Sequence, residues 1–203
     1  VTSTRSNVTV SGYVVSVPSV TGKTPLLDAA RLMLREKKGL LPVIESEEKP
    51  VLKGVVSLLD VFMNIDLERI PDKQVSEIMT TKVVTTRPDD HITRIWDLMI
   101  EKDFTGLPVV TEDRTIGMIT RFDMLKGTAR IGKESERRPS DSMQMTVEKI
   151  MSTPLYSVKP EDNVRSVIEL MLKHGVGRMS VVDDGRLVGI VDRNDLIKCY
   201  LGE

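Results

Sequence analysis

Residues 107–125 read LPVVTEDRTIGMITRFDML, and residues 179–197 read MSVVDDGRLVGIVDRNDLI. Both stretches contain two apolar, β-branched runs around a short polar turn, followed by an acidic residue six positions after a glycine. Those glycines, Gly117 and Gly189, occupy the same place in the two stretches, and the correspondence continues without a gap well beyond both of them. Because a fixed internal period sets the architecture of a chain, we predict a protein built from repeats.

Three copies of the pattern account for most of the chain. Residues 75–127 and 147–202 match without a gap, and residues 14–64 form a third, more divergent copy with short insertions. We expect a first repeat over residues 1–70, a second over 71–130, a linker over 131–146 and a third repeat over 147–203. Each unit has about 55 residues, which is too few to bury a comfortable core alone, so the copies are expected to pair.

Each copy predicts the same order of elements: strand, helix, strand, strand, helix. In the second copy the β-branched run 83–86 precedes a proline, and apolar residues recur at helical spacing from Ile92 to Met99. Asp89 or Asp90 is expected to cap that helix, as Thr24 is in the first copy. Asp184-Gly185 predicts a tight hairpin turn between two strands of the third copy. The fold class is therefore α/β (α+β).

Composition excludes several classes of protein. With 29 basic and 30 acidic side chains, the chain has no basic excess to attract nucleic acid. Its apolar runs are too short for a membrane span. One cysteine and two histidines assemble neither a disulfide nor a zinc site, and neither a nucleophile–base pair nor a phosphate-binding loop suggests an enzyme. We expect a cytoplasmic protein without a metal or a catalytic cofactor.

These repeats resemble CBS domains, the regulatory repeats that associate in pairs as Bateman modules. The marks that carry the resemblance are LPVV at 107–110, GMITRFDML at 117–125 and VVDDGRLVGIV at 181–191. The chain is most similar to multi-repeat, stand-alone archaeal and bacterial CBS proteins related to the gamma subunit of AMP-activated kinase. The resemblance implies a non-catalytic module that binds AMP, ADP, ATP, S-adenosylmethionine or methylthioadenosine between paired repeats, with nucleotides containing phosphate favoured.

Candidate ligand-binding residues lie where the third strand of a repeat meets its last helix. A hydroxyl there and a carboxylate three residues later flank a helix N-terminus, whose amides favour phosphate, while the carboxylate suits ribose hydroxyls. Thr120 and Asp123, with Arg121 adjacent as a phosphate partner, form one set, and Ser57 and Asp60 form another. The glycine three positions before each hydroxyl is expected to let the backbone approach a ligand.

The same spacing is also that of a helix capping box, which needs no ligand. In the third copy Asp192 replaces the hydroxyl residue and precedes Asp195. Aspartate is a good N-cap, but its charge disfavours phosphate, so at this position capping and ligand binding are equally supported.

The family resemblance implies composite sites, each completed by the partner repeat. For the Thr120 site the expected partner segment comprises Val176, Gly177 and Arg178, with Arg178 as a phosphate contact. For the Asp195 site it comprises Phe104, Thr105 and Gly106, which are expected to flank adenine. Ser180 replaces the proline of the motif, which together with Asp192 makes an uncharged ligand tail more suitable there.

Pairing and partners follow from the number of copies. The second and third copies are expected to pair, leaving the first to a fourth repeat that precedes it or, alternatively, to a homodimer. The expected partners are an adenosine nucleotide and a regulated protein that the sequence does not identify. A ligand-free interaction scaffold is the rival interpretation.

Overall fold

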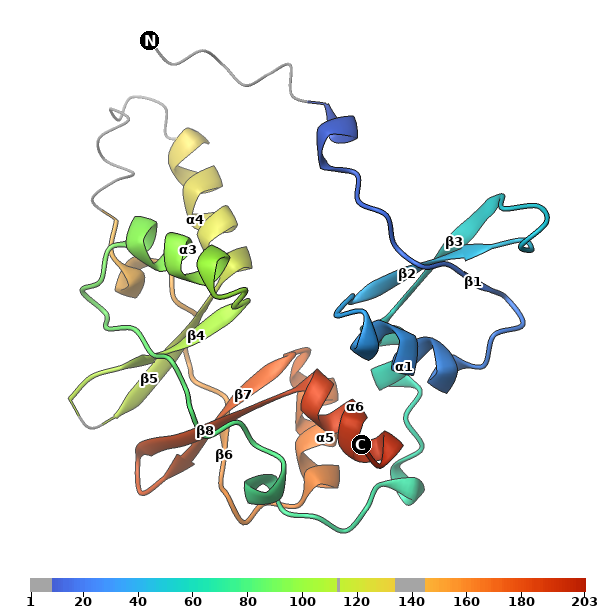
Figure 1. Ribbon diagram of the computed structural model, residues 1–203. Coiled ribbons are helices and arrows are strands. Elements are labelled where there is room, and N and C mark those ends of the chain that lie inside the picture. Colours follow the sequence, from blue (N-terminus) through green and yellow to red (C-terminus); the bar gives the residue numbers. More distant parts are fainter. Residues whose placement is uncertain (1–8, 113, 134–144) are drawn as a thin grey trace. The chain divides into compact units, whose positions relative to one another are not determined.

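The structure is a computed structural model that describes residues 9–112, 114–133 and 145–203 (Figure 1). The chain divides into two compact units, residues 1–66 and 67–203. The first unit contains copy one, and the second contains copies two and three. Each unit is described by itself below.

Copy one forms a three-stranded sheet in the order β1-β2-β3, with β1 parallel and β3 antiparallel to β2. Its elements in chain order are the 3-10 turn η1 (Val10–Tyr13), β1 (Val20–Thr21), α1 (Leu26–Arg35), β2 (Leu40–Ile44), β3 (Leu52–Ser57) and α2 (Leu58–Met63).

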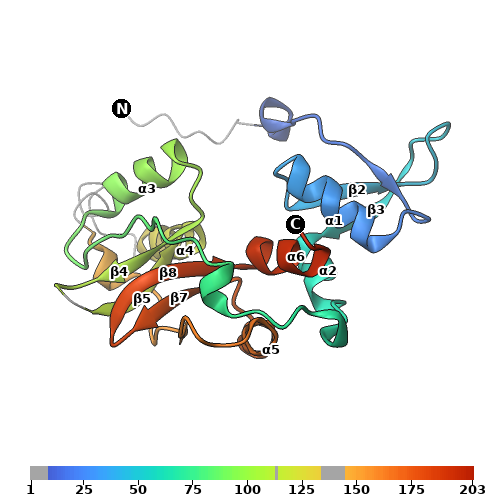
Figure 2. The same ribbon diagram turned by 60° about the horizontal axis from the view of Figure 1, so that its bottom comes forward.

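Copies two and three repeat this plan in the second unit, with α3 and α4 beside one hairpin and α5 and α6 beside the other (Figures 1 and 2). The elements are η2 (Leu67–Arg69), η3 (Val75–Glu77), α3 (Ile92–Glu101), β4 (Gly106–Val110), β5 (Thr115–Thr120), α4 (Arg121–Lys133), η5 (Val147–Lys149), β6 (Ser157–Val158), α5 (Val164–His174), β7 (Arg178–Asp183), β8 (Arg186–Asp192) and α6 (Arg193–Leu201).

The predicted element order is confirmed, with two local differences. In copy two the first strand is reduced to a single parallel bridge between Thr86 and Val109. Helix α4 extends to Lys133, so the first residues of the expected linker are helical, while residues 134–144 of that linker lie outside the described residues. The Asp184-Gly185 turn has φ of 45° and 82°, as a hairpin turn of this type requires.

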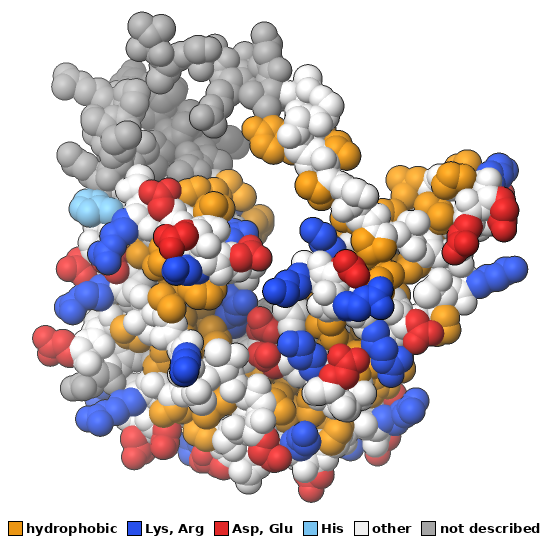
Figure 3. All heavy atoms as spheres, viewed as in Figure 1, with side chains coloured by type: hydrophobic (Ala, Val, Ile, Leu, Met, Phe, Trp, Pro, Cys, Tyr) orange, Lys and Arg blue, Asp and Glu red, His pale blue; other side chains and the backbone are white. Residues whose placement is uncertain are grey.

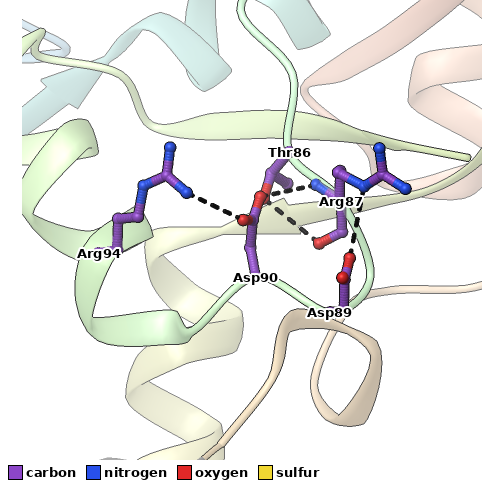
Figure 4. Close-up of polar contacts among 5 residues, drawn as sticks. All are labelled: Thr86, Arg87, Asp89, Asp90 and Arg94. Atoms are coloured by element: carbon purple, nitrogen blue, oxygen red, sulfur yellow. Dashed lines mark hydrogen bonds and ion pairs between the residues drawn. The ribbon is translucent and has the colours of Figure 1, made fainter.

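The predicted caps of the first helix are wrong in copies one and two. The N-cap of α3 is His91, without a side-chain bond, because Asp90 turns back onto the preceding strand (Figure 4). Asp90 Oδ2 accepts from the Thr86 hydroxyl at 2.7 Å and the Arg87 amide at 2.8 Å, and Oδ1 accepts from Arg94 at 3.2 Å. Burial alone would raise the pKa of Asp90, but these donors hold it below its ordinary value.

Copy one shows the same behaviour. Thr24 does not cap α1, whose N-cap is Pro25, and its hydroxyl instead accepts from the Thr21 amide at 3.1 Å. In both copies the polar side chain therefore fixes the turn from strand to helix rather than the first turn of the helix.

The hydrophobic core of copy two includes side chains from the segment that leads into copy three. Val147 is fully buried there, with Ile150 and Met151 packed against the same cluster. The other buried members come from α3, β4, β5 and α4: Ile95, Met99, Leu107, Val109, Ile119 and Met124. Copy two thus completes its core with residues that precede the first strand of its neighbour.

Backbone hydrogen bonds join copies two and three reciprocally. The Val147 amide donates to the Asp90 carbonyl at 3.0 Å, and the Val75 amide donates to the Asp162 carbonyl at 2.9 Å. The two donors occupy equivalent positions of their copies, and so do the two acceptors. The leading segment of each copy therefore binds the strand-to-helix turn of the other.

A second reciprocal pair lies at the outer strands. Thr80 exchanges two backbone hydrogen bonds with Ile190 on β8, both of 2.9 Å, and Ser152 exchanges two with Met118 on β5, of 2.8 and 3.3 Å. The pairing adds a short antiparallel bridge to the free edge of each hairpin, which satisfies backbone groups that would otherwise be unpaired.

Gly117 is required by this close approach. A Cβ on Gly117 would lie 2.9 Å from the Ser152 carbonyl oxygen, and one on Gly189 would lie 2.5 Å from the Met79 sulfur. We expected these glycines to admit a ligand, whereas the structure shows that they admit the neighbouring repeat. Gly54, the corresponding residue of copy one, would meet no atom of the described residues within 4 Å.

Copy one exposes apolar side chains on the equivalent strand and helix. Val55, which corresponds to Met118, is 58% exposed, and Leu52 is 63% exposed. Leu59 and Met63 on α2 are also exposed. Figure 3 shows hydrophobic side chains gathered over the hairpin of β2 and β3.

We expect Gly117→Ala to lower the free energy of unfolding by about 1–3 kcal/mol, because the added methyl group meets backbone that cannot move aside easily. Gly54→Ala is the matched control, with no loss expected, since alanine is favoured over glycine in a strand and the space is free. Urea unfolding of both variants measures the difference. Equal losses would show that the close contact of copies two and three does not explain the glycine.

Candidate functional site

The candidate residues of copy two lie where β5 ends and α4 begins. The Thr120 amide and hydroxyl donate to Asp123 Oδ2 at 2.9 and 2.6 Å, and the Asp123 amide donates back to the Thr120 hydroxyl at 3.2 Å. Asp123 Oδ1 accepts from the hydroxyl of Ser152, in the leading segment of copy three, at 3.0 Å. The expected capping box is therefore formed, and its carboxylate also binds the neighbouring repeat.

Equivalent capping boxes form in the other copies. The Ser57 amide donates to Asp60 Oδ2 at 2.7 Å, and the Asp192 amide donates to Asp195 Oδ2 at 2.9 Å. Asp60 is exposed, whereas Asp195 is partly buried. Capping thus accounts for the spacing in every copy, and a ligand role needs further support.

A cavity of about 210 Å³ supplies that support at Asp195. Copy three contributes Asp192 and Asp195 to its lining, and copy two contributes Phe104 and Gly106. These are four of the five residues expected for the composite copy-three site. Thr105 does not line this cavity, and its carbonyl accepts from the Arg121 amide at 3.1 Å.

Arg178 lies in the same cavity, although we expected it at the Thr120 site. Its guanidinium donates to Asp192 Oδ2 at 3.0 Å and to the Gly106 carbonyl at 3.3 Å. Both partners of the ion pair are largely buried, with 24% and 21% of their side chains exposed. Arg178 therefore neutralises the aspartate that replaces the hydroxyl residue of the motif.

Arg121 is directed away from the Thr120 hydroxyl. Its guanidinium donates to the Met99 carbonyl at 2.7 Å and to Asp103 at 3.1 Å, so it binds the C-terminal end of α3. Arg193, its equivalent in copy three, donates to the Val176 carbonyl at 3.1 Å in the same way. This repetition indicates a structural role for both arginines, and a phosphate contact by Arg121 stays a prediction.

The other expected partners of Thr120 are held by the backbone of their own repeat. Val176 accepts from the Arg193 side chain, and Gly177 accepts from the Arg193 amide at 3.2 Å. Neither they nor Thr120 and Asp123 line the 210 Å³ cavity. Of these two candidate sites, the one at Asp195 is therefore the one where residues of both repeats line a common cavity.

Sequence reasoning missed the segment that leads into the first strand of copy two. Thr80, Lys82 and Val84 line the cavity opposite Asp195. A signal was present, because Met79-Thr80-Thr81 and Met151-Ser152-Thr153 occupy equivalent positions in the two copies. Hydroxyl residues recurring just before a strand indicated that this segment has a defined role.

Ser180 also differs from its repeat equivalents. It replaces Pro108 at the corresponding position and is fully buried, and its hydroxyl has no hydrogen-bond partner among the described residues. A buried hydroxyl without a partner has a cost that a proline ring does not.

The electrostatics of the cavity are dominated by carboxylates. Burial and the neighbouring charge of Asp192 raise the pKa of Asp195 to about 6. Asp103, Asp192 and Asp195 line it together with Lys82 and Arg178, which gives the lining a formal charge of about −1 when all five are ionised, and Arg121 beside the cavity forms an ion pair with Asp103. The cavity therefore suits a ligand that donates hydrogen bonds and carries no excess negative charge.

The raised pKa predicts a pH-dependent stability. Asp195 binds its proton more tightly in the folded chain than in the unfolded chain. This difference stabilises the fold fully below about pH 4, and the stabilisation is lost as the pH rises through about 6. Asp195→Asn keeps an oxygen for the Asp192 amide but carries no charge. At pH 7.5 we expect the free energy of unfolding of this variant to exceed that of the wild type by about 1–2 kcal/mol, allowing for partial solvent screening. At pH 4 the two values should match.

Urea unfolding at both pH values measures this difference. The same difference at pH 4 and pH 7.5 would contradict a raised pKa at Asp195.

Copies two and three are thus paired α/β repeats with a cavity between them. The chain belongs to the CBS domain family, whose sequence pattern matches residues 10–66, 75–129 and 147–202. The prediction of three such repeats is thereby confirmed.

Solved structures show the same arrangement. Protein MJ1225 from Methanocaldococcus jannaschii, proposed as an archaeal homologue of g-AMPK, has a TM-score of 0.81 at 23% identity, over 91% of this chain and 67% of that chain. The CBS domain pair of protein MJ0100, in complex with 5′-methylthioadenosine and S-adenosyl-L-methionine, has a TM-score of 0.56 at 26% identity, covering 65% of this chain and 98% of that chain.

A third solved structure is that of CBSX2 in complex with AMP. It has a TM-score of 0.55 at 26% identity and covers 64% of this chain and 96% of that chain. By sequence, the chain is 25% identical to MJ1225 over 178 residues and spans 62% of the length of that relative.

The described residues contain neither a candidate membrane span nor a candidate metal site. None of their helices combines the length and hydropathy needed to cross a membrane. In the same residues, histidine, cysteine and acidic side chains do not gather into a group of three that could hold a metal ion.

Proposed function

We propose that copies two and three form a sensor module that binds an adenosine-containing ligand in the cavity at Asp195. The observation that carries the proposal is the convergence of Asp195 and Asp192 from one repeat with Phe104 from the other around one cavity. Asp195 accepts hydrogen bonds from the two ribose hydroxyls, and Phe104 with the backbone of Gly106 flanks the adenine. The role is regulatory and non-catalytic.

The charges in the cavity indicate which adenosine derivative binds. Asp192 occupies the place of the hydroxyl that would donate to a phosphate, and its charge repels one. The sulfur-containing nucleosides, methylthioadenosine and S-adenosylmethionine, carry a neutral or a cationic group there. MJ0100, at 26% identity, binds both of these ligands in its CBS domain pair, which supports this choice.

The Thr120 and Asp123 pair remains a candidate for a second site of the same module. There the hydroxyl is retained, so AMP, ADP or ATP would meet no extra carboxylate, and CBSX2 binds AMP. For ligand to reach Asp123, the Ser152 hydroxyl must release Oδ1. Ligand binding would then change the contact between the two repeats, and this is how occupancy is transmitted to a regulated protein partner.

Isothermal titration calorimetry tests the proposal with methylthioadenosine, S-adenosylmethionine, AMP, ADP and ATP. We expect one of the two sulfur-containing ligands to bind more tightly than ATP, and Asp195→Asn to weaken that binding by about tenfold or more, because a hydrogen bond to a charged acceptor is lost.

Asp162→Asn is the matched control, since Asp162 also accepts from a backbone amide in copy three but lies outside the cavity. It should leave binding unchanged. Absence of binding by every ligand at millimolar concentration would refute the sensor and favour the interaction scaffold.

We further propose that a fourth CBS repeat covers copy one. Copies two and three each protect an outer strand with the leading segment of the other, and the glycine beneath that segment is Gly117 or Gly189. Copy one retains the glycine, Gly54, together with the exposed apolar residues Val55 and Leu52. Ser57 and Asp60 would then join a second composite site.

Gly54→Trp tests this pairing, because the side chain has free space within copy one but would block a partner segment. We expect the Val55 amide to be protected from hydrogen exchange in the paired protein and to exchange freely in the variant. Sedimentation identifies the partner. A wild-type dimer that dissociates in the variant is formed by a second copy of this chain, whereas a monomeric wild type means that a second copy does not supply the fourth repeat. Unchanged protection in the variant would contradict the pairing.

A further inference from the structure

A second cavity, of about 390 Å³, lies within the unit formed by copies two and three. Its volume falls in the range of about 300–1,000 Å³ that is usual for small-molecule sites. It is lined by the tips of both hairpins and by the extended segment that leads into copy two. None of the residues assigned above to a ligand site lines it.

Two arginines related by the repeat converge on this cavity. Arg114 precedes β5 and Arg186 begins β8, and the two residues occupy the same position in the alignment of copies two and three. Approximate symmetry between the copies thus brings two guanidinium groups from separate hairpins to one place.

These arginines differ from the others in the module. Arg121, Arg178 and Arg193 bind backbone carbonyls. Among the described residues, the guanidinium groups of Arg114 and Arg186 make no hydrogen bond and no ion pair. Both side chains are exposed, so their donors are free for a ligand.

The remaining polar lining supplies further donors. Thr81 and Thr85 contribute hydroxyls, Thr111 contributes a third that donates to the Arg114 carbonyl at 3.4 Å, and Glu112 contributes one carboxylate. With two arginines, the described residues of the lining carry a formal charge of about +1, opposite in sign to that of the cavity at Asp195.

The two cavities share a wall. Along the extended segment, Thr80, Lys82 and Val84 face the cavity at Asp195, and Thr81 and Thr85 face the cavity at the arginines, while Val83 lines both. One segment therefore separates two sites of opposite charge, although it is not a regular strand: the chain bends at Lys82, and the Val83 amide donates to the Thr81 carbonyl at 3.1 Å.

We propose that the cavity at Arg114 and Arg186 binds a phosphate group carried by a small molecule, independently of the adenosine site. Two guanidinium groups match the oxygens of a phosphate in geometry and charge, and the threonine hydroxyls complete its hydrogen bonds. Glu112 accepts a hydrogen bond from a hydroxyl or amino group on the rest of the ligand.

Titration calorimetry with inorganic pyrophosphate tests the proposal. We expect saturable binding by the wild type, weakened by about tenfold or more in Arg114→Gln/Arg186→Gln. Arg94→Gln is the matched control, because Arg94 is an exposed arginine of copy two that lies outside the cavity. It should bind like the wild type.

Two further measurements keep the test specific. Unfolding curves of the double variant should match the wild type, since both arginines are exposed and unbonded. Asp195→Asn should leave pyrophosphate binding unchanged, because that residue lines the other cavity. No pyrophosphate binding, equal binding by the double variant, or equal loss in Arg94→Gln would overturn the proposal.

Discussion

Four backbone segments of copies two and three hold one another in place. Hydrogen bonds from Val75 and Val147 reach the strand-to-helix turn of the opposite copy, and Thr80 and Ser152 add bridges to its outer strand. These bonds position the two hairpins, and the hairpins position everything else in the module: the cavity at Asp195, its wall of leading-segment residues, and the convergence of two arginines on a second cavity.

Charge distribution then separates the roles of the two cavities. The wall that both share contributes one charge, that of Lys82, to the cavity at Asp195, and the other charges come from residues on either side of the wall. Carboxylates of copy three face one side, where Arg178 forms an ion pair with Asp192. Unbonded guanidinium groups face the other side. A single segment, joined to β8 at Thr80 and to β4 at Thr86 by backbone hydrogen bonds, therefore presents different side chains to the two cavities.

Much of the fold could be predicted from the sequence, since the repeat, the hairpin at Asp184-Gly185 and the capping boxes depend on local patterns. The failure of Asp90 and Thr24 to cap their helices could not be predicted, because each side chain can bind either of two nearby backbone amides of similar geometry. The predicted site of Arg178 was wrong for another reason. Its partner, Asp192, lies on the adjacent strand, and the periodicity of the sequence does not indicate such a contact. Lys82 was missed because its segment belongs to no regular element.

Val147 and Met151 belong to copy three in sequence and to the core of copy two in space. Copy two cannot complete its core until the chain has brought the leading segment of copy three back to it. We therefore expect the pair to fold as one cooperative unit, and contacts so distant in sequence to slow its folding relative to a local α/β domain. Boundaries drawn between repeats along the sequence do not mark boundaries between folding units.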